Sequence, residues 1–208
     1  VFLKDWSPEY IPEGCPPSSN VQIKFPATKR NNSPVTMNWT DGGIRPFHPD
    51  LIPPGDPIGD NDSSNGVLMI GTKGVMTCGT YGLVPKVYLK NGTKLEMPPL
   101  PAPVAGTPSV PEYGHQRSWT NACKAGFNSK EHLELTSSFD YSGPLTETVL
   151  MGNLAIRSYN LRKQGANNRM EFYGRQKLLW DGTSMKITNF EDANQFVGRN
   201  YRSGWELS

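Results

Sequence analysis

Hydrophobic and polar residues alternate in the first part of the chain with the period of two that half-buried β-strands show. The alternation covers residues 21–25 and 35–40, which a polar connection joins, so it predicts a hairpin. Residues 67–78 and 86–97 each predict a further pair of strands around a turn that contains glycine. Together these runs predict a sheet of at least six strands.

In the second half of the chain, the hydrophobic residues recur with the longer period of α-helices. Residues 112–125 predict one helix, and residues 144–159 predict the clearest one, because proline at the first helical position costs no hydrogen bond. A hairpin at 178–187 and a last helix capped by Asn189 complete the pattern. We expect one stripe of the clearest helix to be buried, with its glycine allowing a close approach. The stripe consists of Leu145, Val149, Gly152 and Ile156.

Composition supports a turn-rich fold. The chain has 208 residues, of which 36% are hydrophobic, enough for the core of one large or two small domains. Its 21 glycines and 19 prolines disfavour an all-helical bundle. Four prolines mark residues 1–20 as an extended lead-in that packs on something else. Residues 44–65 form a loop of a length that is uncommon unless the loop is functional or disordered.

Charge and motifs restrict the possible chemistry. The net charge is only +2 and the basic residues are scattered, so the sequence predicts no nucleic-acid partner. No apolar run approaches the roughly 18 residues of a membrane span, which predicts no membrane partner. Three widely spaced cysteines, Cys15, Cys78 and Cys123, fit neither a disulfide framework nor a metal site. Nucleotide-binding, zinc-protease and serine-hydrolase motifs are absent, so the residues alone do not indicate an enzyme.

Four side chains are candidates for binding a ligand. His48 lies on the long loop and could donate a proton or a hydrogen bond to a substrate; the alternative is an exposed loop histidine. His115 and Trp119, four residues apart on a predicted helix, fit a polar group beside an aromatic surface for a sugar, and the alternative is core packing. Tyr141 lies in the polar segment 140–142 before the clearest helix, where backbone N–H groups favour an anionic or polyhydroxylated ligand. The alternative there is simple capping.

Four blocks of sequence, taken together, resemble one protein family. They are residues 34–43 (PVTMNWTDGG), 71–82 (GTKGVMTCGTYG), 139–157 (FDYSGPLTETVLMGNLAIR) and 180–205, which runs from a Trp-Asp pair to a Gly-Trp pair. In this order they resemble the C-terminal domain of bacterial-type Gfo/Idh/MocA oxidoreductases over nearly the whole chain.

The resemblance implies an α+β fold of the kind found in the C-terminal domain of glyceraldehyde-3-phosphate dehydrogenase. Its open, largely antiparallel (mixed) sheet has six or more strands, helices cover one face, and the other face commonly mediates homo-oligomerisation. Residues 1–20 would then lead in from an N-terminal domain, and residues 21–208 would form the substrate-binding and oligomerisation domain. The family's N-terminal Rossmann domain binds NAD or NADP. Since the dinucleotide fingerprint and the catalytic segments lie upstream in that family, we expect no catalytic residue, cofactor site or metal in these residues, and no activity from them alone.

The family resemblance also implies a substrate, namely a sugar, polyol or glycoside. Hydride transfer needs the substrate carbon held against the nicotinamide, so this domain would supply the wall that orients the substrate. His48 and Tyr81, the latter in the turn at 78–82, are candidates for that wall. Two alternatives remain open: a glycosidase that oxidises its sugar transiently with tightly held NAD, and a non-catalytic β-rich module that dimerises. Localisation in the bacterial cytoplasm or periplasm also remains open.

Overall fold

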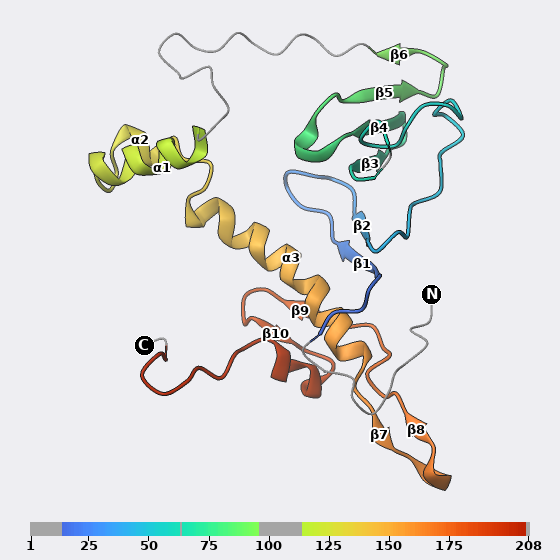
Figure 1. The fold of residues 1–208 in the computed structure, drawn as a ribbon, viewed down its shortest axis with the longest axis vertical. Coiled ribbons are helices and arrows are strands. Elements are labelled where there is room, and N and C mark those ends of the chain that lie inside the picture. The colour runs from blue at the N-terminus through green and yellow to red at the C-terminus, as the bar shows by residue number, and fades with distance from the viewer. Residues whose placement is uncertain (1–13, 63, 96–113, 207–208) are drawn as a thin grey trace. The chain divides into compact units, whose positions relative to one another are not determined.

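The computed structural model describes residues 14–62, 64–95 and 114–206. The chain divides into two compact units (Figure 1): the first comprises Val1–Arg45 with His115–Ser208, and the second comprises Pro46–Gly114. Helices and small antiparallel sheets are both present, so the α+β class is confirmed. The predicted lead-in at 1–20 is described only from residue 14, and the rest of it lies outside the described residues.

The second unit contains a four-stranded antiparallel sheet with the strand order β3-β4-β5-β6. The strands are β3 (Val67–Ile70), β4 (Gly74–Cys78), β5 (Lys86–Leu89) and β6 (Lys94–Leu95), and the 3₁₀ turn η1 (Thr80–Gly82) follows β4. Both predicted strand pairs are therefore confirmed, although residues 96–97 of the second pair lie outside the described residues.

One face of this sheet forms the core of the second unit. Val75 and Tyr88 are paired across β4 and β5, and both are buried against Ile52 of the long loop. Three partly buried residues surround this cluster: Leu51, Ile58 and Leu68. Since Ile52 is only 1% exposed, the long loop folds onto the sheet and covers one of its faces.

The first unit begins with a hairpin of β1 (Asn20–Phe25) and β2 (Val35–Thr40). Its helices are α1 (Gly114–Ala125), α2 (Lys130–Leu133) and α3 (Phe139–Tyr159). Its remaining elements are short: β7 (Lys163–Gln164), η2 (Ala166–Asn168), β8 (Met170–Glu171), β9 (Trp180–Asp181), β10 (Lys186–Ile187) and the 3₁₀ helix η3 (Glu191–Phe196). β7 pairs with β8, and β9 pairs with β10.

The core of the first unit lies between α3 and the C-terminal elements. Leu154, Ile187 and Ala193 are buried together. Asn194 joins β10 to η3, because its side chain accepts a hydrogen bond from the N–H of Ile187 at 2.8 Å and donates to the carbonyl of Ile187 at 3.0 Å. Five partly buried residues pack on this core: Leu178, Trp180, Phe190, Phe196 and Val197.

The predicted cap of the last helix is wrong. Asn189 instead accepts a hydrogen bond from the N–H of Leu179 at 2.7 Å and donates to the carbonyl of Lys177 at 2.8 Å. The helix that follows is the short η3, whose N-cap residue is Phe190 and makes no side-chain hydrogen bond. Asn189 therefore joins two distant segments of chain, because the carbonyl and N–H groups at 177–179 lie within its reach.

The expected sheet of six or more strands is not seen. β1–β2 and β3–β6 are separate sheets, and the largest sheet among the described residues has four strands. The residues between β2 and β3 include the long loop, which folds onto the β3–β6 sheet through Ile52. The described residues therefore do not form the single open sheet that the family resemblance implies.

α3 also differs from the prediction. It begins at Phe139, five residues earlier than predicted, so Pro144 lies inside the helix. The stripe expected to be buried is largely open: Leu145 is 53% exposed and Val149 is 60% exposed. No atom lies within 4 Å of where a Cβ would sit on Gly152, so this glycine allows no close approach here. The buried core lies against the C-terminal half of α3, around Leu154.

Candidate functional site

The long loop is fastened to the turn that follows β4. The carboxylate of Asp60 accepts hydrogen bonds from the backbone N–H of Thr80 at 3.0 Å and from its hydroxyl at 2.6 Å. The N–H of Gly59 donates to the hydroxyl of Thr77, which is 1% exposed, at 2.9 Å. A Cβ on Gly79 would lie 2.2 Å from the Asp60 carboxylate, so only glycine allows the carboxylate to approach this closely. These contacts hold the loop and the turn as one structure.

A second anchor joins the loop to β5. The hydroxyl of Tyr88 donates to the Asp56 carboxylate at 2.6 Å. Burial, together with the hydrogen bond to Asp56 and its negative charge, raises the pKa of Tyr88 to about 12. The Nε2 atom of His48 lies 3.1 Å from the carbonyl oxygen of Asp56, so the predicted histidine is held by the same residue. His48 is exposed, and its ring is oriented by the anchored loop.

Tyr81 is presented by a strained turn. Its φ is 61°, a left-handed conformation that bulky residues rarely adopt, and its side chain is 95% exposed. The N–H of Gly79 donates to the carbonyl of Leu83 at 2.8 Å, which closes the turn around Tyr81. Strain of this kind persists where surrounding contacts impose it, and it is concentrated at ligand-binding sites. The turn therefore offers a phenol hydroxyl to solvent from a fixed backbone.

The other predicted residues lie in the first unit. His115 and Trp119 lie on α1, and Trp119 is 59% exposed, so neither is packed in a core. Tyr141 lies in the first turn of α3 and is also exposed. The N-cap residue, Ser138, makes no side-chain hydrogen bond. His48 and Tyr81 thus share the second unit, whereas these three residues belong to the other unit.

The open face of the β3–β6 sheet is apolar. The strand register places Met69 opposite Met76, Met76 opposite Val87, and Val87 opposite Leu95, so four apolar residues form one row across the sheet. Met69 is 51% exposed. A shallow depression of about 340 Å³ lies on this sheet, lined mostly by apolar residues. Soluble monomers rarely leave such a row in water, so this face is a candidate contact surface.

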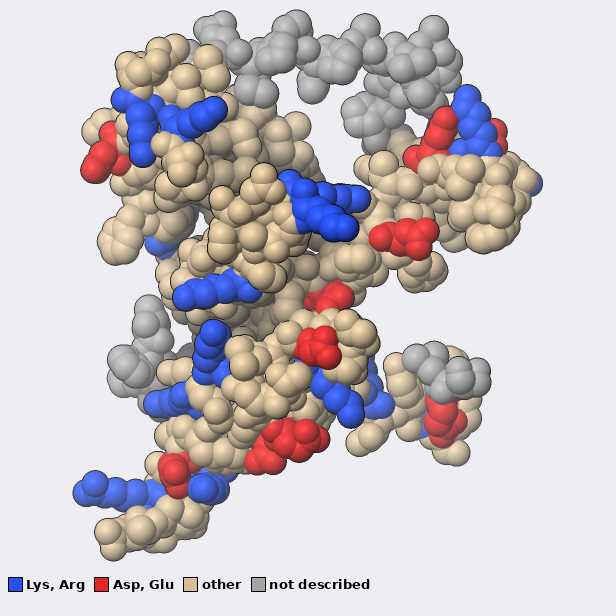
Figure 2. Space-filling model, turned by 180° about the vertical axis from the view of Figure 1, so that it is seen from behind, with Lys and Arg blue, Asp and Glu red and all other residues tan. Residues whose placement is uncertain are grey.

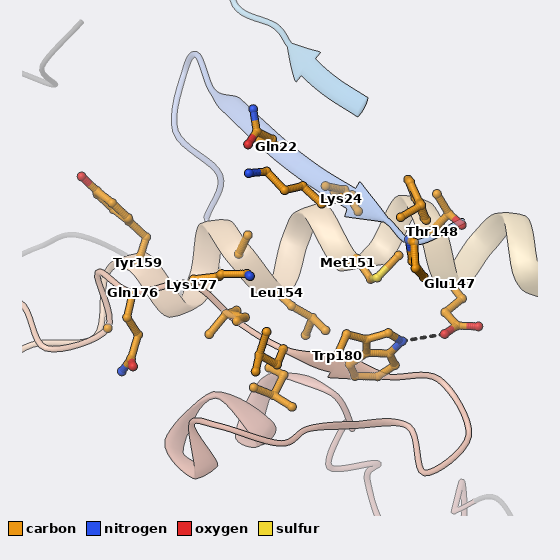
Figure 3. A pocket seen from close by; sticks show the side chains of 18 of the residues that line it. Gln22, Lys24, Glu147, Thr148, Met151, Leu154, Tyr159, Gln176, Lys177 and Trp180 are labelled. Atoms are coloured by element: carbon orange, nitrogen blue, oxygen red, sulfur yellow. Dashed lines mark hydrogen bonds between the residues drawn. The ribbon is translucent and has the colours of Figure 1, made fainter. Parts of the chain in front are cut away.

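Sequence reasoning missed a groove in the first unit (Figure 3). It has a volume of about 820 Å³ and is lined by β1, α3 and the residues around β9. The indole N–H of Trp180 donates to the Glu147 carboxylate at 2.6 Å and closes one end. Its size falls within the range of small-molecule sites, but the candidate residues from the sequence do not line it. No local pattern signals this groove, because its walls are separated by about 150 positions in the chain.

Metal-binding clusters and membrane-spanning helices are absent from the described residues. No group of three or more His, Cys, Asp or Glu side chains there is arranged to hold a metal ion. None of the described helices is long and apolar enough to cross a membrane. Cys15, Cys78 and Cys123 are free thiols. On the face seen in Figure 2, basic and acidic side chains are interspersed.

Comparison with protein-family models and with curated proteins finds no match for this chain.

Proposed function

We propose that the chain is the substrate-binding and oligomerisation domain of an NAD(P)-dependent oxidoreductase that acts on a sugar, polyol or glycoside. The sequence blocks that resemble the Gfo/Idh/MocA family support this proposal, and one of them contains the turn of Tyr81. The observation that carries it furthest is the joined loop and turn of the second unit. Asp60 fastens the loop to the turn that carries Tyr81, and His48 contacts the carbonyl of Asp56 on the same loop, so the backbone around each side chain is held in place.

The side chains of His48 and Tyr81 suit a polyhydroxylated ligand. The Tyr81 hydroxyl and the His48 ring both donate and accept hydrogen bonds, as a sugar hydroxyl requires. Their backbone is fixed before the ligand arrives, which reduces the entropy lost on binding. NAD or NADP, held by an N-terminal Rossmann domain, would accept the hydride. The role of this chain would be to orient the hydroxyl-bearing carbon, and it would supply no proton-transfer residue of its own.

The proposal includes the finer architecture that the family implies. In that architecture one open, largely antiparallel sheet of six or more strands, of the glyceraldehyde-3-phosphate dehydrogenase type, carries helices on one face. The β1–β2 hairpin and the β3–β6 sheet are separate sheets among the described residues, so the single larger sheet is proposed from the family resemblance alone. The apolar row from Met69 to Leu95 would then lie on the face that joins identical subunits.

The test of the substrate role uses the protein expressed from its complete reading frame. A chain about 150 residues longer that carries NAD or NADP is the expected result. Tyr81→Phe and His48→Gln should each raise KM for the sugar substrate several-fold, whereas Tyr201→Phe, at another exposed tyrosine, should not. If both KM values stay at the wild-type level, the proposed wall is refuted. Turnover without added cofactor would indicate the glycosidase alternative instead.

The test of the oligomerisation role changes the apolar row. Met76→Lys places a charge at its centre and should convert an oligomer to a monomer in analytical ultracentrifugation. Leu133→Lys, at an exposed apolar residue of α2, is the matched control and should leave the oligomer intact. A Met76→Lys protein that remains oligomeric would exclude this face. An oligomer without nucleotide or activity would favour the non-catalytic assembly module.

A further inference from the structure

Apolar side chains line most of the groove of the first unit. Its floor is one face of α3, to which Met151, Leu154 and Ala155 belong because they are three or four positions apart. Its two walls come from residues 22–26 and 176–180, so the whole lining lies within the first unit. Binding sites for small organic molecules have this size, about 820 Å³, and a mainly apolar lining in which a few polar groups orient the ligand.

Two lysines give one end of the groove a positive charge. Lys24 lies on the wall formed by β1 and Lys177 lies on the opposite wall, and Figure 3 shows both toward the end where Tyr159 and Gln176 lie. Both lysines are exposed, and neither forms an ion pair with a carboxylate of the described residues. Two ammonium groups on facing walls can therefore bind one anionic group between them.

The other end of the groove carries a negative charge. Glu147 lies there with Trp180, and its carboxylate accepts the indole N–H at 2.6 Å, a hydrogen bond that does not neutralise it. From Glu147 to Tyr159 the helix rises by about 18 Å at roughly 1.5 Å per residue. A ligand with an anionic group at one end of an apolar body is therefore favoured in one direction only, with the anion at the lysines and the body directed toward Trp180.

We propose that this groove binds an amphipathic anion, namely an unbranched alkyl chain that ends in a carboxylate or phosphate group. The head group lies between Lys24 and Lys177, and the alkyl chain lies over Met151 and runs toward Trp180. An alkyl chain suits the groove because the lining extends along several turns of α3 and is mainly apolar. A cationic head group would meet two like charges at the same place. This inference does not depend on the proposed oxidoreductase function.

Isothermal titration calorimetry of the full chain with a series of simple ligands tests the chemical class. We expect decanoate to bind at one site per chain and at least ten-fold more tightly than hexanoate, because each additional buried CH₂ group strengthens binding about four-fold. Decanoate should also bind at least five-fold more tightly than decanol or decylammonium, and added salt should weaken the binding of decanoate but not of decanol. Whichever of decanoate and decyl phosphate binds more tightly identifies the head group.

Substitutions at the two ends of the ligand locate it in the groove. Lys24→Gln and Lys177→Gln should each raise the Kd for decanoate about three-fold, and together at least ten-fold, while the Kd for decanol stays unchanged. Lys186→Gln is the matched control, because Lys186 is an exposed lysine of the same unit that does not line the groove.

The floor is tested on α3 itself. Met151→Glu places a negative charge under the alkyl chain and should raise the Kd for decanoate at least ten-fold. Val149→Glu makes the same kind of change at a residue that is 60% exposed and does not line the groove, so it should change the Kd less than two-fold. Circular dichroism shows whether each variant is folded, and the lysine variants test the site even if Met151→Glu does not fold.

Three results would overturn the proposal. The first is no saturable binding of decanoate or decyl phosphate, as expected if a second copy of the chain or another protein segment covers the groove. The second is equal affinity for decanoate and decanol, because the lysines would then have no role. The third is binding that Met76→Lys abolishes while the double lysine variant retains it, since the ligand would then lie on the apolar row of the β3–β6 sheet.

Discussion

The hydroxyl of Tyr88 provides the sharpest test of how the long loop is held. Tyr88→Phe keeps the ring, and with it the packing on Ile52 and Val75, but removes the donor 2.6 Å from the Asp56 carboxylate. A hydrogen bond to a charged group contributes about 1.5–3 kcal/mol. We therefore expect the variant to lose about 2 kcal/mol of unfolding free energy.

The same hydrogen bond predicts a dependence on pH. The pKa of Tyr88 is higher in the folded protein than its ordinary value, so folding favours the protonated phenol. Its contribution is complete below pH 10 and is lost as the pH rises through about 12. The difference in stability between wild type and Tyr88→Phe should therefore shrink across this range.

The assay is urea unfolding of both proteins, followed by far-ultraviolet circular dichroism at pH 8 and at pH 11. Hydrogen exchange at the amides of β4 and β5 at pH 7 reports the second unit separately. The reasoning would be refuted if wild type and variant were equally stable at pH 8 to within about 0.5 kcal/mol, which is the effect of an ordinary surface substitution. A difference that persists unchanged at pH 11 would refute the linkage to the phenol.

Two further predictions concern the first unit. A Cβ on Gly174 would lie 1.9 Å from the carbonyl oxygen of Ser158, so Gly174→Ala should lower the free energy of unfolding by about 1–3 kcal/mol. Gly152 lies on open helix surface, so Gly152→Ala should raise the free energy of unfolding by about 0.5–1 kcal/mol. Urea unfolding of both variants checks the two signs. Trp180→Phe removes the donor to Glu147 and should destabilise the protein by about 1.5–3 kcal/mol, while Glu147→Gln, which keeps an acceptor, should cost less in the same measurement.

The sequence predicted the local elements where burial on one face imposes a period. Residues 21–25 and 35–40 were predicted as a hairpin because their apolar residues alternate, and both strands form. The helix predicted at 112–125 forms over Gly114–Ala125, the part of it that is described. The helical period did not predict burial on α3, where Leu145 and Val149 are exposed because the contact that reaches this half of the helix, from Trp180 to Glu147, lies on another side of it.

The sequence was less informative about the sites. It singled out His48 and Tyr81, but it did not show that Asp60 and Asp56 fasten the loop that carries the histidine. Asp and Gly are typical turn residues, so their presence in a loop does not indicate whether the carboxylates accept hydrogen bonds from distant parts of the chain. The role of Asn189 was misassigned for the same reason, because local rules favour a cap over long-range hydrogen bonds.

By itself, the sequence determined the α+β class and the approximate positions of most strands and helices. Each of these depends on residues within a few positions of one another, where alternation or helical spacing is visible. Only the tertiary structure decided the groove, the Tyr88–Asp56 anchor and the Trp180–Glu147 contact. These features join residues more than thirty positions apart, and their formation depends on how separate elements pack, which no local period encodes.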